Sequence, residues 1–544
     1  MQALFQSLFK AKTEQEVDDV IQAHSLYFKS ANWFPIGGNE SNFSVIENQQ
    51  SNPIASLVEK VTNSIDANLM KRCLEEGINP RGETAPKTMD EAVIQFYPKS
   101  KDWDLKTFRR KQAEEIQVVA DGPPKNTSVI IYDNGEGQNP DDFENTFLSL
   151  MRGNKNDIMF VQGKYNMGGS GAIVFCGKKG YQLIGSKRYD NKGNFGFTLV
   201  REHPFTTGES TTKKNTWYEF LKIESKIPNF EIDEMDLKLH DRKFKTGTII
   251  KLYSYQFPTG YYGFAQDLNQ SFNEFLFDPI LPILTVDKEE RYPKNKVLEA
   301  DLYGLKRRLE EEKNYVEDWF SENYEDELFG TMKVTCYVFK PKQEAKSVKD
   351  TKEDIKRRYF KNGMSVLFSM NGQVQGHYTT EFITRTLKFN LLKDYLLIHV
   401  DCTQMKYEFR KELFMASRDR LKNGDESNQL REYLGRKLRQ SQLDDTNRRR
   451  KETIGFESED TTDLIKSFAK NLPKDSELFK LLQNTLKLEE KKKQQEQKVD
   501  KNQQEKKEQT PFNPKRFPTL FKYHNNKEGK ISVVSLPKWR FRSN

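Results

Sequence analysis

The most regular pattern in the sequence is that of Ser56-Leu-Val-Glu-Lys-Val-Thr-Asn-Ser-Ile-Asp-Ala-Asn68. At 3.6 residues per turn, Glu59, Asn63 and Asp66 are spaced i, i+4 and i+7 and therefore share one stripe of a helix. The opposite stripe is apolar and consists of Ile54, Leu57, Val61, Ile65 and Leu69. The pattern predicts a helix that buries one face and presents polar groups on the other. Alone, it is typical of an ordinary surface helix.

Two strand-like runs follow near Glu114–Asp121 and Thr127–Asp133, and Gly122-Pro-Pro between them predicts a hairpin. The second run ends in Asp133-Asn-Gly-Glu-Gly137, where Asn-Gly by itself is an ordinary turn signal. The next residues, Asn139-Pro-Asp-Asp142, have the cap, N1 proline and acidic first turn of a helix. Helical spacing continues at Phe143, Phe147 and Leu150. A strand, a glycine turn and a helix in this order bring bare backbone close to a ligand and direct the Asp133 carboxylate into a pocket.

A second glycine cluster, Gly163-Lys-Tyr-Asn-Met-Gly-Gly-Ser-Gly171, runs into Ala172-Ile-Val-Phe-Cys176. Glycines that leave backbone N–H groups free at a helix start form an anion nest suited to phosphates. A flexible surface loop is the alternative. The cluster is neither a Walker A loop nor a Rossmann fingerprint, because the residues and spacing of both are absent. With the polar stripe before it, the cluster favours a nucleotide site floored by Glu59, Asn63 and Asp66.

The next strand-like runs alternate apolar and polar residues, as in an antiparallel sheet with one covered face. They lie at Tyr181–Gly185, Phe195–Val200, Thr216–Ile223 and Thr246–Ser254, the last with a Gly-Thr at its entrance.

The order of these motifs over roughly residues 35–260 resembles the GHKL ATPases. That superfamily includes type II topoisomerases, ninety-kilodalton heat-shock chaperones, histidine kinases, MutL and the MORC proteins, and the layout here is most similar to the MORC, MutL and chaperone members. The resemblance implies a Bergerat-type ATP-binding α/β sandwich. One departure is Asn166, which stands in the glycine loop where the chaperones carry glycine.

The resemblance implies ATP as ligand, Mg²⁺ as cofactor and a hydrolytic activity. Glu59 would be the general base, Asn63 would coordinate Mg²⁺, and Asp133 would accept from the adenine amino group. Further implied contacts are Gly135 and Gly137 beside the adenine, Gly163, Lys164, Gly168, Gly169, Ser170 and Gly171 in a lid over the phosphates, Thr248 behind the adenine, and Asp66 as a cap or brace of the pocket.

Residues 266–425 are expected to form a second domain, with a helix predicted at Gln266–Phe277. In this range, Ser365-Val-Leu-Phe-Ser-Met-Asn-Gly-Gln-Val-Gln-Gly376 resembles the ribosomal-protein-like transducer domain of several GHKL ATPases. Strands are predicted at Val334–Phe339, Ser365–Phe368 and Tyr395–Val400, and a helix at Thr379–Thr386. In that domain a basic side chain reaches the γ-phosphate, and Ser417-Arg418-Asp419 resembles the turn that supplies it. The resemblance therefore implies Arg418 as a catalytic residue. Arg420, Lys411 and Lys422 compete for the role, and a solvated basic loop is the alternative.

From Asn428 the composition shifts to helix formers and charge, with Leu430, Leu434 and Leu438 on one helical stripe. Arg448, Arg449, Arg450 and Lys451 form a basic patch, read either as a nucleic-acid contact or as a solvated face. Further helices are expected at Leu464–Phe468 and Leu478–Leu488, an exposed helix or linker at Lys491–Gln509, and a small β element at Phe512–Phe521 and Lys530–Leu536.

The sequence thus predicts an α+β protein with six segments. They are an N-terminal helical segment at 1–34, the ATP-binding domain at 35–265, the transducer-like domain at 266–425, a helical basic region at 426–490, a charged linker or helix at 491–510 and the β element at 511–544.

Composition narrows the class of protein. The chain has 544 residues, of which 31% are charged and 35% hydrophobic, and carries a net charge of +8, which permits nucleic-acid contact without requiring it. It lacks both a run of 18 apolar residues and the plan of a signal peptide, so a cytoplasmic protein without a membrane partner is expected. The few histidines and four scattered cysteines indicate neither a zinc site nor a disulfide framework.

The expected function is an ATPase whose lid closure and ATP-dependent homodimerisation act as a clamp or switch on DNA or a partner effector protein, by analogy in prokaryotic antiviral defence. A chaperone-like remodelling ATPase is the first alternative, although Lys491–Gln509 and the lack of a large middle domain argue against it. A histidine kinase would need His24 as its phosphoacceptor, and an ATP-sensing scaffold without hydrolysis would not need Glu59.

Overall fold

The structure is a computed structural model that describes most of the chain. The described residues are 1–150, 155, 157–163, 170–258, 264–272, 275–288, 298–302, 304–311, 314–344, 346–360, 363–415, 418, 420–453, 521–525 and 531–535. The chain divides into two compact units, Met1–Arg449 and Arg450–Asn544. The first unit contains both helices and mixed sheets, so the expected α+β class is confirmed. None of the helices in the described part is long and apolar enough to cross a membrane.

The first sheet has ten strands among the described residues, in the order β1-β6-β5-β4-β10-β3-β2-β11-β12, with β7 paired to β5. All neighbours are antiparallel except β2 and β11, which are parallel. The strands are β1 (Trp33–Pro35), β2 (Ile116–Asp121), β3 (Ser128–Asp133), β4 (Gln182–Lys187), β5 (Phe195–Glu202), β6 (Tyr218–Leu221), β7 (Asn229–Phe230), β10 (Gly247–Leu252), β11 (Ile283–Asp287) and β12 (Leu298–Leu302). The hairpin predicted around Gly122 is therefore present as β2 and β3.

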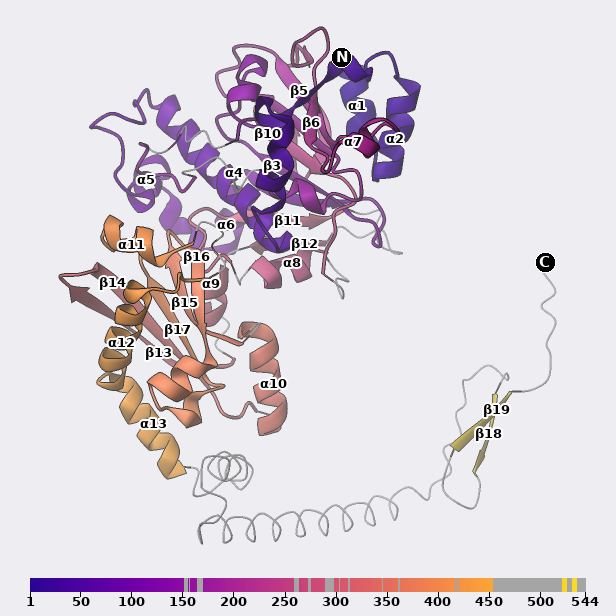
Figure 1. Cartoon of the computed structure of the whole chain (residues 1–544). Helices are drawn as coiled ribbons and strands as arrows, with labels where there is room; N and C mark the ends of the chain where they lie inside the picture. Colours follow the sequence, from indigo (N-terminus) through magenta and orange to yellow (C-terminus); the bar gives the residue numbers. More distant parts are fainter. Residues whose placement is uncertain are drawn as a thin grey trace. The chain divides into compact units, whose positions relative to one another are not determined.

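Helices cover both faces of this sheet. Val118 and Ile131 belong to a core shared with α4 (Pro53–Glu75), α5 (Met89–Phe96) and α8 (Phe264–Phe272). Val119 and Ile130, on the opposite face, belong to a core shared with α1 (Gln2–Lys10), α2 (Glu14–Ala23), β8 (Met235–Leu239) and β9 (Arg242–Phe244). Figure 1 shows α4 and α5 on one side of β3 and β10, and α1 and α2 on the other. The prediction of one covered face for the later runs is wrong, because β4 and β6 are buried along their whole length and β5 along most of it.

The polar-striped helix α4 has strong local start signals. Asn52 caps it by accepting from the backbone N–H groups of Ile54 and Ala55, and Pro53 occupies the first helical position. The helix then runs for 23 residues. Its apolar stripe packs on β2 and β3, which fixes the rotation of the helix and hence the direction of its polar side chains.

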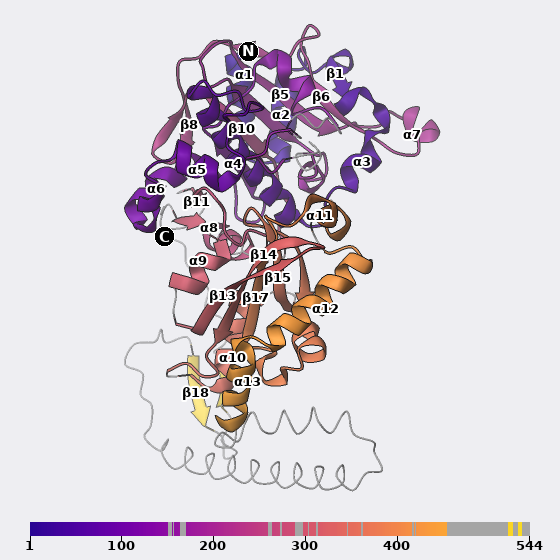
Figure 2. The same ribbon diagram turned by 90° about the vertical axis from the view of Figure 1, so that its left-hand side faces the viewer.

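A second sheet has the order β13-β14-β17-β15-β16, with β15 and β17 parallel and the other pairs antiparallel. Its strands are β13 (Val316–Asp326), β14 (Gly330–Phe339), β15 (Met364–Met370), β16 (Gln373–Thr379) and β17 (Leu396–Asp401). One face packs against α11 (Tyr407–Leu413), α12 (Asp425–Arg439) and a π-helical turn at Phe382–Thr386, the other against α9 (Gly304–Glu311) and α10 (Val348–Tyr359). Figure 2 shows α12 running along this sheet.

The expected domain boundaries differ from the observed ones. The first sheet includes β11 and β12, so the first domain continues to Leu302 and does not end at residue 265. The helix α1 packs on that sheet, so residues 1–34 belong to the same domain. Leucines of α12 lie in the core of the second domain, which therefore does not end at 425. These elements are joined by contacts between distant parts of the chain, which local patterns do not reveal.

Two predicted helices are absent. The segment from Asn139 to Leu150 forms only a 3₁₀ turn at Pro140–Asn145, and Ala172–Cys176 forms only a 3₁₀ turn at Ile173–Phe175. The glycine cluster consequently does not lead into a helix whose N-terminus could attract an anion, so that part of the phosphate-nest prediction is wrong. The remaining α-helices of the described residues are α3 (Phe43–Glu47), α6 (Lys106–Ala113), α7 (Glu209–Thr212) and α13 (Gln442–Thr453).

The C-terminal segment is described at two strands only. They are β18 (Phe521–Asn525) and β19 (Ile531–Ser535), which pair antiparallel within the predicted β element. The elements predicted at Leu464–Phe468, Leu478–Leu488 and Lys491–Gln509 lie outside the described residues.

Candidate functional site

The helix α4 is enclosed on almost all sides. Every residue from Ile54 to Asp66 is buried except Asn63, which is exposed. Asn63 thus marks the one place on this stretch where the helix opens to solvent. The predicted polar stripe borders that opening, because Glu59 precedes Asn63 by one turn and Asp66 follows it.

Glu59 contacts both domains of the first unit, of which the first is built on the ten-stranded sheet and the second on the sheet β13-β14-β17-β15-β16. Its side chain is 11% exposed, and its Oε1 accepts hydrogen bonds from Gln373 Nε2 at 2.9 Å and from Arg418 Nη1 at 2.9 Å. Gln373 begins β16 and Arg418 follows α11, so both donors come from the second domain. The carboxylate expected to activate water is therefore held from outside its own domain.

Asp66 braces the start of the glycine cluster. Its Oδ1 accepts from the backbone N–H of Gln162 at 2.9 Å, and its Oδ2 accepts from that of Gly163 at 2.8 Å. Burial raises the pKa of the Asp66 carboxyl, against the opposing effects of Lys155 and of these two N–H groups. Asp66 therefore fits the brace expected from the sequence, because each of its carboxylate oxygens holds one backbone N–H of the chain that leads into the glycine cluster.

Asp133 lies at the end of β3, directly below α4. Ser64 Oγ donates to its Oδ2 at 3.1 Å, and the backbone N–H of Gly135 donates to its Oδ1 at 3.0 Å. Burial raises the pKa of Asp133 to about 7, although both hydrogen bonds oppose the rise. In its ionised form, a buried carboxyl oriented by two fixed donors is an acceptor suited to a ligand amino group.

Thr248 is the cross-strand neighbour of Asp133. It pairs with Asp133 in β3 and with Ser186 in β4, and its hydroxyl lies 3.1 Å from that of Ser186. Residues directly opposite each other in antiparallel strands share a face, so the three side chains form a buried polar row under α4. The structure thus brings together Asp133 and Thr248, as the sequence predicts.

The two glycines after β3 are required by protein contacts. A Cβ at Gly135 would lie 2.5 Å from the Cβ of Ala67 in α4. Gly137 has φ +60°, and a Cβ there would lie 2.0 Å from the carbonyl oxygen of Lys187. Both glycines therefore allow the turn to pass between α4 and β4, which accounts for them without an adenine ring.

The described ends of the predicted lid both contact the region of α4. A Cβ at Gly163 would lie 3.1 Å from Asp66 Oδ2 and 3.4 Å from Asn63 Oδ1. At the other end, Ser56 Oγ donates to the carbonyl of Gly171 at 3.3 Å, and Ser170 Oγ donates to Gln49 Oε1 at 2.9 Å. The remaining predicted lid residues, Lys164, Gly168 and Gly169, lie outside the described residues.

Arg418 is at the tip of a hairpin closed by the bridge between Phe414 and Leu421. Its φ of +55° lies in the left-handed region, a strained conformation that clusters at functional sites in folded proteins. The competing cations point elsewhere: Arg420 Nε contacts Met415 Sδ, and Lys422 Nζ donates to the Lys411 carbonyl, while Lys411 is exposed. Arg418 is the one of these four that contacts α4 in the described structure.

Three residues beside the site were not predicted. Gln373 begins β16 and carries no local signal. Lys60, beside Glu59, is buried, and its burial lowers its pKa to about 8. Lys155 lies 3.7 Å from Glu136 and carries a positive charge close enough to lower the pKa values of Asp66 and Asp133. Lys60 could have been found from the sequence, because a lysine one residue after Glu59 falls near the stripe shared by Ser56 and Ser64.

The side chains present fit an oxygen-rich anionic ligand. The Gln49 side chain lies beside Gly171, and its buried Nε2 has no acceptor among the described residues. Lys60 has no carboxylate within ion-pair distance in the described part of the chain. Asn63 offers one amide oxygen at the opening, and the described residues contain no group of three metal-ligating side chains. A cation here would take most ligands from water and phosphate, which suits Mg²⁺.

The predicted basic patch falls on α13. Arg448 is largely exposed and pairs with Asp445 at 2.5 Å, and Arg449 contacts Thr446 Oγ1 at 3.2 Å. Arg450 and Lys451 continue the same helix. The structure therefore supports a solvated basic helix face and leaves the nucleic-acid contact as a prediction.

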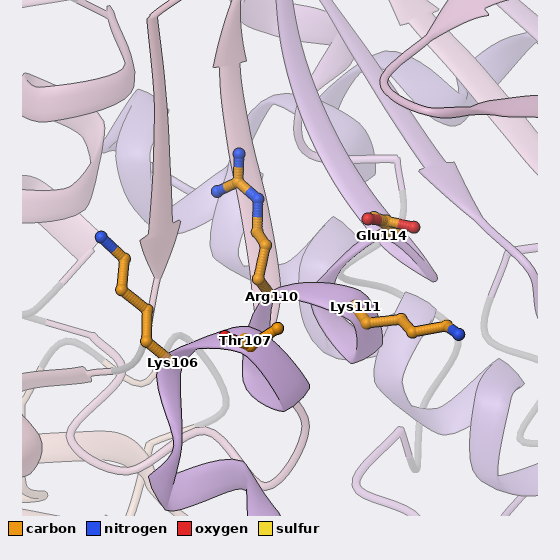
Figure 3. Close-up of a pocket in the computed structure, with 5 residues that line it drawn as sticks. All are labelled: Lys106, Thr107, Arg110, Lys111 and Glu114. Carbon is orange, nitrogen blue, oxygen red and sulfur yellow. The ribbon is translucent and has the colours of Figure 1, made fainter.

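A pocket of about 440 Å³ lies at α6 and is lined by Lys106, Thr107, Arg110, Lys111 and Glu114. Figure 3 shows that the side chains of Lys106 and Lys111 diverge instead of converging on one point. Arg110 already pairs with Glu299 and with Asp301, the latter at 2.7 Å. These features do not form a built anion site.

In comparisons with known proteins, no protein-family model matches the chain, and no curated protein matches it.

Proposed function

We propose that this protein is a Mg²⁺-dependent ATPase of the GHKL class with a Bergerat-type nucleotide site under α4. The observation that carries the proposal is the contact of Glu59 with Arg418 across the two domains, at 2.9 Å. An acidic side chain on the floor helix and a basic side chain from the second domain meet at one point. This pairing suits a site where one group activates water and the other stabilises a phosphoryl group.

The chain's own residues divide the work at this site. Asp133, held by Ser64 and Gly135, accepts from the adenine amino group. Asn63 would hold Mg²⁺, which neutralises phosphate charge when bound. Glu59 accepts a proton from the attacking water. Arg418 leaves Glu59 for the γ-phosphate as the triphosphate enters, which couples the second domain to the nucleotide.

The consequence proposed for the whole cycle is a switch. ATP orders the lid between Gly163 and Gly171, closes the second domain through Arg418 and favours a homodimer that acts on DNA or on a partner protein. Hydrolysis releases the contacts. The two alternatives are remodelling of a client protein and ATP sensing without hydrolysis. Turnover measurements distinguish ATP sensing from the other two functions, because a sensor binds ATP without hydrolysing it.

The deciding experiment is ATP hydrolysis by the full chain with and without Glu59. Glu59→Ala is expected to lower turnover by roughly 10²–10⁴, the usual contribution of a general base, while ATP still binds. Glu75→Ala, in the exposed last turn of the same helix, is the matched control and keeps parental turnover. If Glu59→Ala hydrolyses ATP at the parental rate, Glu59 is not the general base. Binding without hydrolysis by the parent chain selects the ATP-sensing alternative.

A further inference from the structure

Both hydrogen bonds to Glu59 reach the same oxygen. Gln373 Nε2 and Arg418 Nη1 each donate to Oε1 at 2.9 Å, whereas Oε2 accepts from none of the described residues. A carboxylate held by two donors on one oxygen cannot rotate freely about its last bond. Oε2 is thereby left with its lone pairs available.

The orientation of the Gln373 amide is determined by its neighbours. Its Oε1 accepts a short hydrogen bond from Arg418 Nη1, and its Nε2 donates to Glu59. Arginine has only donors and an ionised carboxylate has only acceptors. The reversed amide would place donor against donor and acceptor against acceptor, so a single orientation satisfies both partners.

The backbone that carries Gln373 is held tightly against its surroundings. The preceding turn has Asn371 and Gly372 at φ +48° and +76°, the left-handed pair of a tight hairpin. A Cβ at Gly372 would lie 1.8 Å from the carbonyl oxygen of Asp278, and the Gly372 carbonyl accepts from the Phe277 N–H at 2.8 Å. From the first domain, Gln162 Nε2 donates to the Asn371 carbonyl at 2.6 Å. Gln373 is therefore presented to Glu59 from a fixed support.

We propose that Gln373 is a positioning residue: when Arg418 moves to the γ-phosphate, the Gln373 amide keeps its hydrogen bond to Oε1 of Glu59 and leaves Oε2 to receive the proton of the attacking water. This inference rests on the proposed ATP hydrolysis. As the water oxygen forms its bond to the γ-phosphorus, its proton passes to Oε2. The bond from the γ-phosphorus to the bridging oxygen breaks, and its electron pair leaves with ADP. Gln373 itself exchanges no proton and acts only through Glu59.

Two substitutions separate the two ends of the Gln373 amide. Gln373→Leu removes both the donor to Glu59 and the acceptor for Arg418. Gln373→Glu keeps an acceptor for Arg418 but replaces the donor to Glu59 with a second carboxylate. Because a hydrogen bond to a charged group is worth a factor of about 10–100, both variants are expected to lose that much turnover. Affinity for ADP should stay within about threefold, since neither variant touches the adenine end.

The pH profile gives a readout that a purely structural role would not move. Loss of the amide donor makes protonation of Glu59 easier, so the acid limb of the pH–rate profile moves to higher pH in both variants. Gln375→Leu is the matched control, because Gln375 is similarly buried in β16 and its amide donates, within the described part of the chain, to the Gln373 carbonyl alone. It keeps parental turnover and the parental profile.

Each contrary result has its own meaning. Parental turnover in Gln373→Glu beside a loss in Gln373→Leu assigns the role to the Arg418 contact and overturns the positioning of Glu59. Slower turnover with an unmoved acid limb overturns it as well. ATP hydrolysis that depends on Glu59 but not on Gln373 refutes this inference alone. A parent chain that does not hydrolyse ATP refutes it together with the proposed function.

Discussion

Burial of charged side chains around α4 sets the pH behaviour expected of this protein. Asp133 and Lys60 are both buried and have pKa values shifted toward neutrality, to about 7 and about 8. In each case desolvation is the largest cause, since burial disfavours the charged form. The two groups therefore give two separate tests. The Asp133 test concerns ligand binding, and the Lys60 test concerns the stability of the protein.

We predict that adenine nucleotides bind less tightly as the pH falls through about 7. Below its raised pKa, Asp133 is protonated and no longer a full acceptor for the adenine amino group. The Kd for ADP should rise up to roughly tenfold per pH unit below that value, in equilibrium titrations. Inosine diphosphate, with a carbonyl in place of the amino group, is the control, because phosphate protonation affects both ligands alike. Equal weakening of the two ligands would remove Asp133 from the adenine contact.

Replacement of the same carboxylate gives a second, independent test. Asp133→Asn turns an acceptor into an amide whose NH₂ group faces the adenine amino group donor to donor. We expect ADP binding to be lost, with the melting temperature unchanged or higher because the variant no longer buries a charge at neutral pH. An affinity close to that of the parent chain would place adenine elsewhere.

We predict that Lys60→Met stabilises the nucleotide-free protein at pH 7. The folded-state pKa of about 8 lies below the ordinary value of 10.5, so the folded state carries a penalty for the buried ammonium. This penalty is complete below pH 8, is about 3 kcal/mol at 1.36 kcal/mol per pKa unit, and disappears as the pH rises to 10.5. Melting temperatures of variant and parent should converge over that interval. A lower melting temperature at pH 7 would mean that Lys60 has a stabilising partner.

Among the secondary-structure elements, the hairpin closed by the bridge between Phe414 and Leu421 is the one on which the proposed coupling of the two domains depends. It approaches β16 so closely that a Cβ at Gly376 would lie 2.9 Å from Leu421 Cδ2 and 3.0 Å from the Arg420 carbonyl carbon. The hairpin is therefore supported by the second sheet, and Arg418 at its tip moves with that domain. A side chain placed in this way reports whether the two domains are together.

Arg418→Ala is expected to leave ADP affinity nearly intact, to slow turnover and to weaken any dimer formed with a non-hydrolysable ATP analogue. An arginine supplied to a phosphoryl-transfer transition state contributes up to about 10³–10⁵ in rate. Sedimentation follows the dimer, and Arg420→Ala and Lys411→Ala serve as controls in the same region. If one of the controls loses activity while Arg418→Ala keeps it, the catalytic cation has been assigned to the wrong residue.

For the molecule as a whole, the prediction concerns the target of the proposed ATP cycle. The basic face of α13 is the segment from which the sequence predicts a nucleic-acid contact, and Arg448 there is largely exposed. Its pairing with Asp445 lowers the net charge that it offers to a phosphate. The salt dependence of DNA binding therefore distinguishes a DNA contact from a solvated helix face.

If the α13 face binds DNA, neutralising Arg448, Arg449, Arg450 and Lys451 should flatten the salt dependence of binding by up to roughly 0.9 per lost phosphate contact in a plot of log K against log salt. Filter binding of labelled DNA to the full chain measures the slope, with and without a non-hydrolysable ATP analogue. Lys106→Gln with Lys111→Gln, on α6, is the control for loss of charge alone. An unchanged slope in the α13 variant returns this patch to the solvated-face interpretation.

Local patterns were sufficient for the parts of the site that lie within one element or one turn. The spacing of Glu59, Asn63 and Asp66 follows from helical periodicity, and Asp133 is recognisable because it ends a strand before a glycine turn. The antiparallel pairing of Thr248 with Asp133 then places two of these predictions side by side. Sequence alone also indicated an α+β protein, since both periodicities are present.

The contacts that complete the site join distant parts of the chain and have no local pattern. Gln373 lies 314 residues from Glu59, and Arg418 lies 359 residues from it. A glutamine at the start of a strand gives no functional signal in a sequence, because its role depends on the helix that its side chain contacts. The same holds for β11, whose parallel partner β2 moves the domain boundary. Hydrogen bonds and burial between distant segments appear only when the chain has folded, and they determine which of the polar side chains can act together.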